Sequence, residues 1–300
     1  MSIPWLDALS FAQKQRLQFI EAMLIWDGSV QRGDVCKVFD VTPNHLTRDI
    51  RRYRTCHKDA LEYDVESRAY RRGRRFKPLL ASGSPEEYLA LLQAHCASRT
   101  TSVLPAMGYV AHAESVPAPT GVIEPEVLRL VMHALRNETN VGITYQSLRE
   151  PNPIRRTIWP HILVYTGERW HVRAYDGDRQ AFRDFVLSRC TEAASTQASA
   201  SVDIPEDCEW RDFERIEIVP APRLSGTQKT VIAKEFGMDD DGTGQLVWSH
   251  PIRKCLVGYF LTRYRLEYGG SYGPRAKSGQ HPYLALRSPE LANVYRFADE

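Results

Sequence analysis

The sequence lacks several features that would define a protein class by themselves. It has no run of eighteen apolar residues, so we expect no membrane-spanning helix. Residues 1–9 have neither the basic flank nor the apolar stretch of a signal peptide. The six cysteines form no Cys-x-x-Cys pair and have no histidine at ligand spacing, which argues against a zinc site or a disulfide framework. We therefore expect a cytoplasmic protein without metal or cofactor, whose cysteines are small buried residues.

The composition is that of an ordinary globular protein. Hydrophobic residues make up 43% and charged residues 25% of the 300 residues, enough for two or three domains with cores of their own. The net charge is only +2, but it is unevenly distributed. Residues 45–77 contain eleven arginines and lysines against five acids, whereas residues 191–210 contain five acids and no basic residue. The first segment has the charge expected of a polyanion-binding surface.

The N-terminal segment has the pattern of a helix-turn-helix. A capping box from Ser10 to Gln13 predicts a first helix that ends before Asp27. A second helix is predicted from near Val30 to Phe39. A third is predicted over 44–54, because Thr42 is a good N-cap and proline suits the next position. Two short helices joined by a brief turn are typical of this DNA-binding motif.

The third predicted helix has two chemically distinct faces. Leu46, Ile50 and Tyr53 recur at helical spacing and predict the buried side. The opposite side carries Asn44, Thr47, Arg48 and Arg51. Arginine and asparagine can each bond a base edge through two hydrogen bonds, and threonine can contact a thymine methyl group or a phosphate. The alternative is a merely solvated basic face, but the helix-turn-helix spacing favours a face that enters the major groove.

A β-wing is predicted after the helices. Leu61, Tyr63 and Val65 alternate with acids, as in a half-buried strand, and the return segment 68–77 is rich in basic residues. Such a hairpin would bind phosphates beside the recognition helix. The predicted DNA-binding residues are Asn44, His45, Thr47, Arg48, Arg51, Arg52, Arg68, Arg71, Arg72, Arg74 and Arg75.

The middle of the chain changes from helical to alternating periodicity. A helix is predicted from Ser84 to about Ala97, a linker over 99–120, and another helix over 124–136. Short strands are predicted over 141–147, 154–164, 169–175 and 182–189. A small, bent β-barrel would pair all of these short strands in one closed sheet. In the third of these strands, burying Trp170 and Val172 would turn His171, Arg173 and Tyr175 to a polar face.

These strands resemble the WYL domain, an Sm/SH3-like barrel of bacterial transcription regulators. The motifs that carry the resemblance are Tyr145-x-Ser147, Arg155-Arg156-x-Ile158-x-Pro160-His161, Arg169-Trp170-His171-Val172 and Phe182-Arg183-x-Phe185-x-Leu187-Ser188-Arg189. The naming triplet is Trp170-His171-Val172 here, a departure at two positions. The resemblance implies a basic and aromatic pocket for a nucleotide or nucleic-acid effector, lined by Tyr145, Ser147, Arg156, His161, Arg169, His171, Arg173, Arg183 and Arg189. The alternative is that several of these arginines only solvate strand edges or pair with Glu168, Asp176 and Asp184.

The C-terminal third is predicted to be mixed α/β. A strand is expected over 215–220, a helix over 225–236, a strand over 245–249 and a helix over 252–266. The order of parts resembles the phage-defence regulators of the BrxR and CapW type. That resemblance implies a homodimer built by the C-terminal region, which binds a double-stranded DNA operator at an inverted repeat and represses a defence operon.

The predicted fold is α+β and multi-domain. We expect a winged helix-turn-helix over 1–98, a linker over 99–120, a WYL barrel over 121–195 and a dimerisation region over 196–300. The rivals are a nucleic-acid-processing enzyme and an accessory nucleic-acid-binding protein without regulatory output. The first lacks support, because no nucleophile-elbow, zinc-protease, Walker or paired-carboxylate motif is present and a pair of His171 with Asp176 would have no nucleophile.

Overall fold

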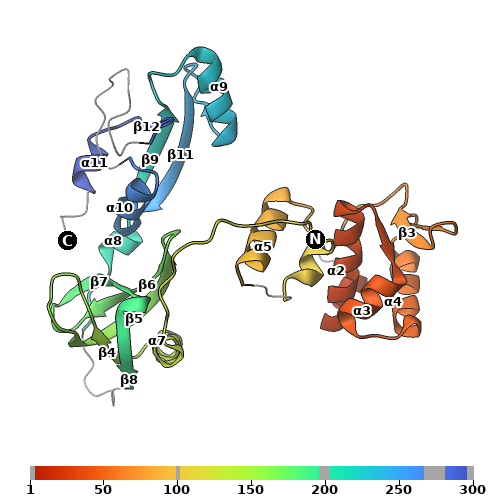
Figure 1. Ribbon diagram of the computed structural model, residues 1–300, viewed down its shortest axis with the longest axis horizontal. Helices are drawn as coiled ribbons and strands as arrows, with labels where there is room; N and C mark the ends of the chain where they lie inside the picture. The colour runs from red at the N-terminus through yellow and green to blue at the C-terminus, as the bar shows by residue number, and fades with distance from the viewer. Residues whose placement is uncertain (1–3, 99–101, 196–202, 267–280, 296–300) are drawn as a thin grey trace. The chain divides into compact units, whose positions relative to one another are not determined.

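The computed structural model describes residues 4–98, 102–195, 203–266 and 281–295. The chain divides into two compact units, residues 1–118 and 119–300, each with its own elements in Figure 1. Among the described residues, none of the helices combines the length and apolar character needed to span a membrane.

The first unit is a winged helix-turn-helix. Its first elements are α1 (Pro4–Asp7), α2 (Phe11–Trp26), β1 (Ser29–Gln31), α3 (Arg32–Phe39), α4 (Pro43–Cys56), β2 (Leu61–Asp64) and β3 (Ala69–Arg72). The three strands form an antiparallel sheet in the order β1-β3-β2. Leu17, Ile20 and Leu24 of α2 lie in the core with residues of α3, α4 and the sheet. The predicted capping box of Ser10 and the N-cap of Thr42 are confirmed.

Two local predictions in this unit are wrong. The second helix begins at Arg32, because residues 29–31 pair with β3 as a strand and bury Val30. The predicted alternation along the wing also ends early, since Val65 is 77% exposed and Tyr63 is 37% exposed. β2 is an edge strand of the small sheet, and it ends at Asp64.

The segment after the wing folds back onto the unit. It contains α5 (Pro85–Ser98), which confirms the helix predicted after Ser84. A short helix, α6 (Leu104–Met107), lies within the stretch that we expected to be a linker. Met107 is fully buried, and Gly108 has a positive φ of 66°. A β-carbon at Gly108 would lie 2.5 Å from the backbone nitrogen of Met23, so only glycine permits this close approach to α2.

The second unit begins with a helix and a five-stranded antiparallel sheet. Its elements are α7 (Pro125–Asn137), β4 (Val141–Tyr145), β5 (Ile154–Tyr165), β6 (Trp170–Asp176), β7 (Ala181–Val186), the short 3-10 helix η1 (Leu187–Arg189) and β8 (Cys190–Ala194). The strand order is β7-β6-β5-β4-β8. In the described part of the chain no ladder joins β7 to β8, so the sheet is bent but open and the predicted closed barrel is not formed.

A second sheet follows in the same unit. The elements are α8 (Cys208–Arg211), β9 (Phe213–Pro220), α9 (Gly226–Glu235), β10 (Asp239–Asp240), β11 (Leu246–Arg253), α10 (Lys254–Arg263), β12 (Leu284–Leu286) and α11 (Leu291–Val294). The order is β10-β11-β9-β12. Its core joins Ile216 and Ile218 to Val257 and Leu261. β11 extends to Arg253, so the last long helix begins two residues later than predicted.

The prediction for the two faces of β6 holds only in part, because Val172 is buried in the core as expected but Trp170 is not. Trp170 is 45% exposed, whereas His171 and Arg173 are 2% and 3% exposed. β6 lies between β5 and β7, and its second face contacts residues around α8 and α10 instead of solvent. The cysteine prediction also holds only in part, because Cys190 is buried but Cys56 and Cys208 are exposed.

Candidate nucleic-acid interface and ligand pocket

Helix α4 presents one apolar and one basic face, as its spacing predicts. Leu46, Ile50 and Tyr53 are at most 3% exposed and pack in the core of the first unit. Asn44, Thr47, Arg48 and Arg51 are all exposed. The side of α4 with the chemistry for reading base edges is therefore available to a partner.

A buried carboxylate that we did not predict holds α4 in this orientation. Asp49 is 4% exposed and accepts hydrogen bonds from Arg16 at 2.8 Å and from Gln13 at 2.9 Å, both on α2. The spacing of Asp49 from Leu46 and Tyr53 places it on the buried side, so its role was readable from the sequence. Any rotation of α4 that hid its basic face would break this ion pair.

The predicted DNA-binding residues fall into two groups. The first group consists of exposed residues whose own side chains make no ion pair or hydrogen bond with other described residues: Asn44, His45, Arg48, Arg51, Arg68, Arg74 and Arg75. The second group is already engaged within the unit. Thr47 donates to the carbonyl of Pro43, and Arg71 lies 3.0 Å from Asp64.

The other engaged residues are Arg52 and Arg72. Arg52 donates to the carbonyl of Ala8 at 3.5 Å. Arg72 donates to the carbonyls of Leu24 and Ile25 near the end of α2, where a cation is stabilised by the helix dipole. Arg72 therefore has a structural role within the unit in addition to its predicted contact with phosphate.

A groove of about 810 Å³ runs between α4 and the wing. It is lined by residues of both elements, including Thr47, Arg51, Arg54, Lys58, Glu62 and Tyr63. The exposed face of α4 and the wing therefore border one concave surface, whose charged lining residues are Arg51, Arg54 and Lys58 against Asp59 and Glu62.

A second cavity, of about 400 Å³, lies in the second unit. Its lining includes five of the nine predicted effector residues, Tyr145, Ser147, Arg156, Arg183 and Arg189. Arg149 and Arg179 add to its positive charge, while Glu150, Asp176 and Asp184 oppose it. Arginine forks beside aromatic rings suit a ligand that combines phosphate with a base.

The other four predicted effector residues are not part of this lining. Arg169 is exposed. His171 is buried against Tyr259 of α10, with ring centroids 5.0 Å apart. Burial, followed by the charges of Arg169 and Arg189, lowers the pKa of His171 to about 4, so the imidazole is neutral. His161 and Arg173 belong to a separate polar network.

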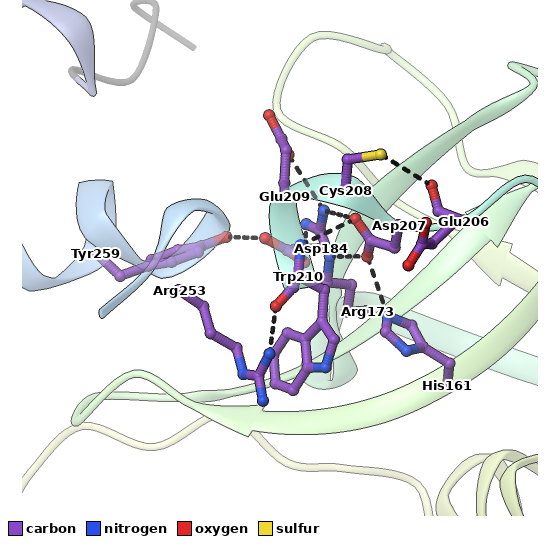
Figure 2. A network of polar contacts seen from close by, with 10 residues as sticks. All are labelled: His161, Arg173, Asp184, Glu206, Asp207, Cys208, Glu209, Trp210, Arg253 and Tyr259. Atoms are coloured by element: carbon purple, nitrogen blue, oxygen red, sulfur yellow. Dashed lines mark hydrogen bonds and ion pairs between the residues drawn. The ribbon is translucent and has the colours of Figure 1, made fainter. Parts of the chain in front are cut away.

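Arg173 is the centre of that network (Figure 2). Its guanidinium donates to Asp207 at 2.5 and 2.8 Å, to Asp184 at 3.1 Å and to Glu209 at 3.1 Å. Burial alone would lower the pKa of Arg173, but its hydrogen bonds to Asp207 and the charge of Asp184 raise it. Arg173 is therefore a permanent cation neutralised within the protein.

Asp207 connects this network to the next element. It is the N-cap of α8 and accepts from the backbone N–H of Trp210. His161 lies 3.1 Å from the Asp207 carboxylate, yet burial outweighs this charge and lowers the pKa of His161. These contacts give Arg173 and His161 structural partners that the strand pattern did not reveal, because the acids come from a segment more than thirty residues away.

Three domain families match the chain in succession. The winged helix-turn-helix domain of BrxR transcriptional regulators matches residues 12–94. The WYL domain matches residues 126–195. The C-terminal dimerization domain of BrxR transcriptional regulators matches residues 213–291.

Relatives named DNA-binding transcriptional repressor CapW align over most of the chain. The protein of Stenotrophomonas maltophilia is 30% identical over 257 residues, 86% of this chain and 84% of that protein. The protein of Pseudomonas aeruginosa is 31% identical over 260 residues, 86% of this chain and 84% of that protein. That of Escherichia coli KTE188 is 30% identical over 259 residues, 85% of this chain and 84% of that protein. With all three domains in order and such identity, the chain belongs to the BrxR/CapW family of WYL-domain transcriptional regulators.

Proposed function

We propose that this protein is a homodimeric repressor that binds an inverted repeat in the promoter of a phage-defence operon. The observation that carries the proposal is the exposed face of α4, which Asp49 fixes through Arg16 and Gln13. One winged helix reads only a few base pairs, so two copies on a two-fold symmetric site give operator specificity. The match of residues 213–291 to a dimerization domain supports the pairing.

Repression would be relieved by an anionic effector in the cavity of the second unit. The cavity volume of about 400 Å³ lies within the range of small-molecule sites. Its five arginines against three acids favour a ligand that carries phosphate, and Tyr145, Phe185 and Tyr259 offer rings beside it. A nucleotide or short oligonucleotide combines both chemistries.

The test is a binding experiment with DNA from upstream of the protein's own operon. We expect the full chain to bind a duplex with an inverted repeat about a thousandfold more tightly than a scrambled duplex of equal length. Analytical ultracentrifugation should find two protomers per duplex. Equal affinity for both duplexes would contradict the repressor and support an accessory nucleic-acid-binding protein instead.

A further inference from the structure

Tyr259 of α10 lies where the ligand pocket meets the C-terminal domain. It lines the cavity of about 400 Å³ together with Asp184 and Arg183 of β7. Asp184 falls within the WYL match and Tyr259 within the dimerization-domain match. One tyrosine of the second domain thus forms part of the wall of the first domain's pocket.

The hydroxyl of Tyr259 bonds the pocket wall directly. It donates to Asp184 Oδ2 at 3.1 Å, and it lies 3.5 Å from Nδ1 of His171 (Figure 2 draws the bond to Asp184). The Nε2 atom of His171 is buried without a hydrogen-bond partner among the described residues. In the neutral tautomer that carries its proton on Nε2, the Nδ1 atom of His171 is a second acceptor within reach of the hydroxyl if the bond to Asp184 is lost.

Helix α10 packs against two different surfaces. Val257 and Leu261 are fully buried in the core of the second sheet. Tyr259 and Arg263, each two residues further along, point to the other side of the helix, since two residues are about 200° of helical rotation. Arg263 packs so closely against the turn between β5 and β6 that a β-carbon at Gly167 would lie 2.1 Å from its guanidinium. A movement of α10 must change both packing surfaces.

Asp184 also connects Tyr259 to α8. Its other oxygen, Oδ1, accepts from Arg173, and Arg173 in turn holds Asp207 at the start of α8. The pocket wall is thereby tied through one carboxylate to two helices beyond the WYL sheet. The side chains of Arg173, Asp184 and Asp207 are 3%, 14% and 8% exposed, so solvent does not screen the interactions between them strongly.

We propose that Tyr259 is the coupling residue that passes occupancy of the pocket to the dimerization domain, through its hydrogen bond to Asp184. This inference rests on the proposed function of the pocket as an effector site. A phosphate held by the pocket arginines would place negative charge near the Asp184 carboxylate. The repulsion weakens the Tyr259–Asp184 bond, the hydroxyl turns to His171, and α10 shifts.

The experiment compares Tyr259→Phe with Tyr264→Phe in the full-length protein. Both changes remove one hydroxyl, but Tyr264 packs on Phe260 and does not line the ligand pocket. Without ligand, we expect Tyr259→Phe to speed amide hydrogen exchange in α10 and to weaken operator binding by about five- to tenfold. Tyr264→Phe should match the wild type. Equal behaviour of the two variants in both measurements would overturn the coupling.

A second arm adds adenosine monophosphate, adenosine triphosphate or the dinucleotide pApA. A bound probe should slow amide hydrogen exchange in β7 in all three proteins. It should weaken operator binding only in the wild type and in Tyr264→Phe. If a probe weakens operator binding of Tyr259→Phe as much as that of the wild type, the proposed coupling is wrong, while the cavity remains supported as the effector site. If none of them protects β7, the proposed nucleotide effector fails, while the ligand-free arm still decides the coupling.

Discussion

The carboxylate of Glu21 and the hydroxyl of Tyr53 form a buried hydrogen bond of 2.6 Å between α2 and α4. Both residues are at most 1% exposed. The second oxygen of Glu21 accepts three backbone N–H groups, from Leu79, Leu80 and Ala81. Burial first, and then the charge of Glu21, raises the pKa of Tyr53 above its usual range. One acid thus joins the recognition helix to the segment that follows the wing.

Removal of the Glu21 carboxylate should lower the urea concentration at which the first unit unfolds. Glu21→Ala leaves the Tyr53 hydroxyl and three N–H groups without a buried acceptor, so we expect a loss of about 3–5 kcal/mol. Urea unfolding followed by circular dichroism measures it. The control is Glu87→Ala at an exposed position of α5, and similar midpoints for both variants would contradict the role given to Glu21.

Substitutions on the recognition face should reduce sequence-specific binding without affecting the fold. Arg48→Ala and Arg51→Ala each remove an exposed side chain, and we expect each to weaken operator binding by about 1–3 kcal/mol. Fluorescence anisotropy with operator and scrambled duplexes separates specific from nonspecific loss. Lys234→Ala, exposed on α9, is the control. Full operator affinity in both arginine variants would mean that another surface reads the DNA.

The wing should contribute affinity without sequence information. Arg74→Ala and Arg75→Ala are each expected to weaken binding equally on all duplexes and to reduce the slope of log affinity against log salt by about one. A salt titration of binding to the operator and to a scrambled duplex provides the measurement. Loss confined to the operator would show that these arginines contact bases.

Arg173 should be required for folding of the second unit. Its substitution by alanine leaves Asp184 and Asp207 buried without their cation, so we expect a loss of about 3–5 kcal/mol in thermal or urea unfolding. Arg183→Ala, on the pocket wall and exposed, should leave stability within about 0.5 kcal/mol of the wild type. Equal stability of these two variants would contradict the structural assignment of Arg173.

Buried His171 should make stability depend on pH. Its pKa in the folded protein is about 4 against an ordinary 6.5, so between these values the unfolded chain binds a proton that the folded chain does not. Stability therefore falls as pH decreases through this window, by roughly 2 kcal/mol between pH 7 and pH 5. The pKa values of His161 and His281 are lowered as well and act in the same direction.

The comparison of wild type with His171→Phe isolates this contribution. Phenylalanine keeps a ring against Tyr259 but does not titrate, so the variant should lose less stability on acidification than the wild type. Urea unfolding at several pH values is the measurement. Parallel pH curves for the two proteins would show that His171 is not the residue responsible.

The first unit was largely predictable because its signals are local. Caps and helical spacing act within a few residues of one another, and they correctly placed α2, α4 and the two faces of α4. Asp49 shares the spacing of Leu46 and Tyr53, so it could have been recognised too. Glu21 stands alone in an apolar run, which marks it as a buried acid, but the sequence does not reveal its partners.

The sequence by itself determined the domain order, the exposed basic face of α4 and the arginine-rich strands, because periodicity and local charge dictate each of them. Only the tertiary structure decided which of those arginines remain available. Arg173 is neutralised by Asp184 of the neighbouring strand and by acids from a distant segment, and the face of β6 that alternation predicted to be polar is covered by the region around α8 and α10. Alternation identifies the two faces of a strand, but what covers each face depends on residues far away in the chain.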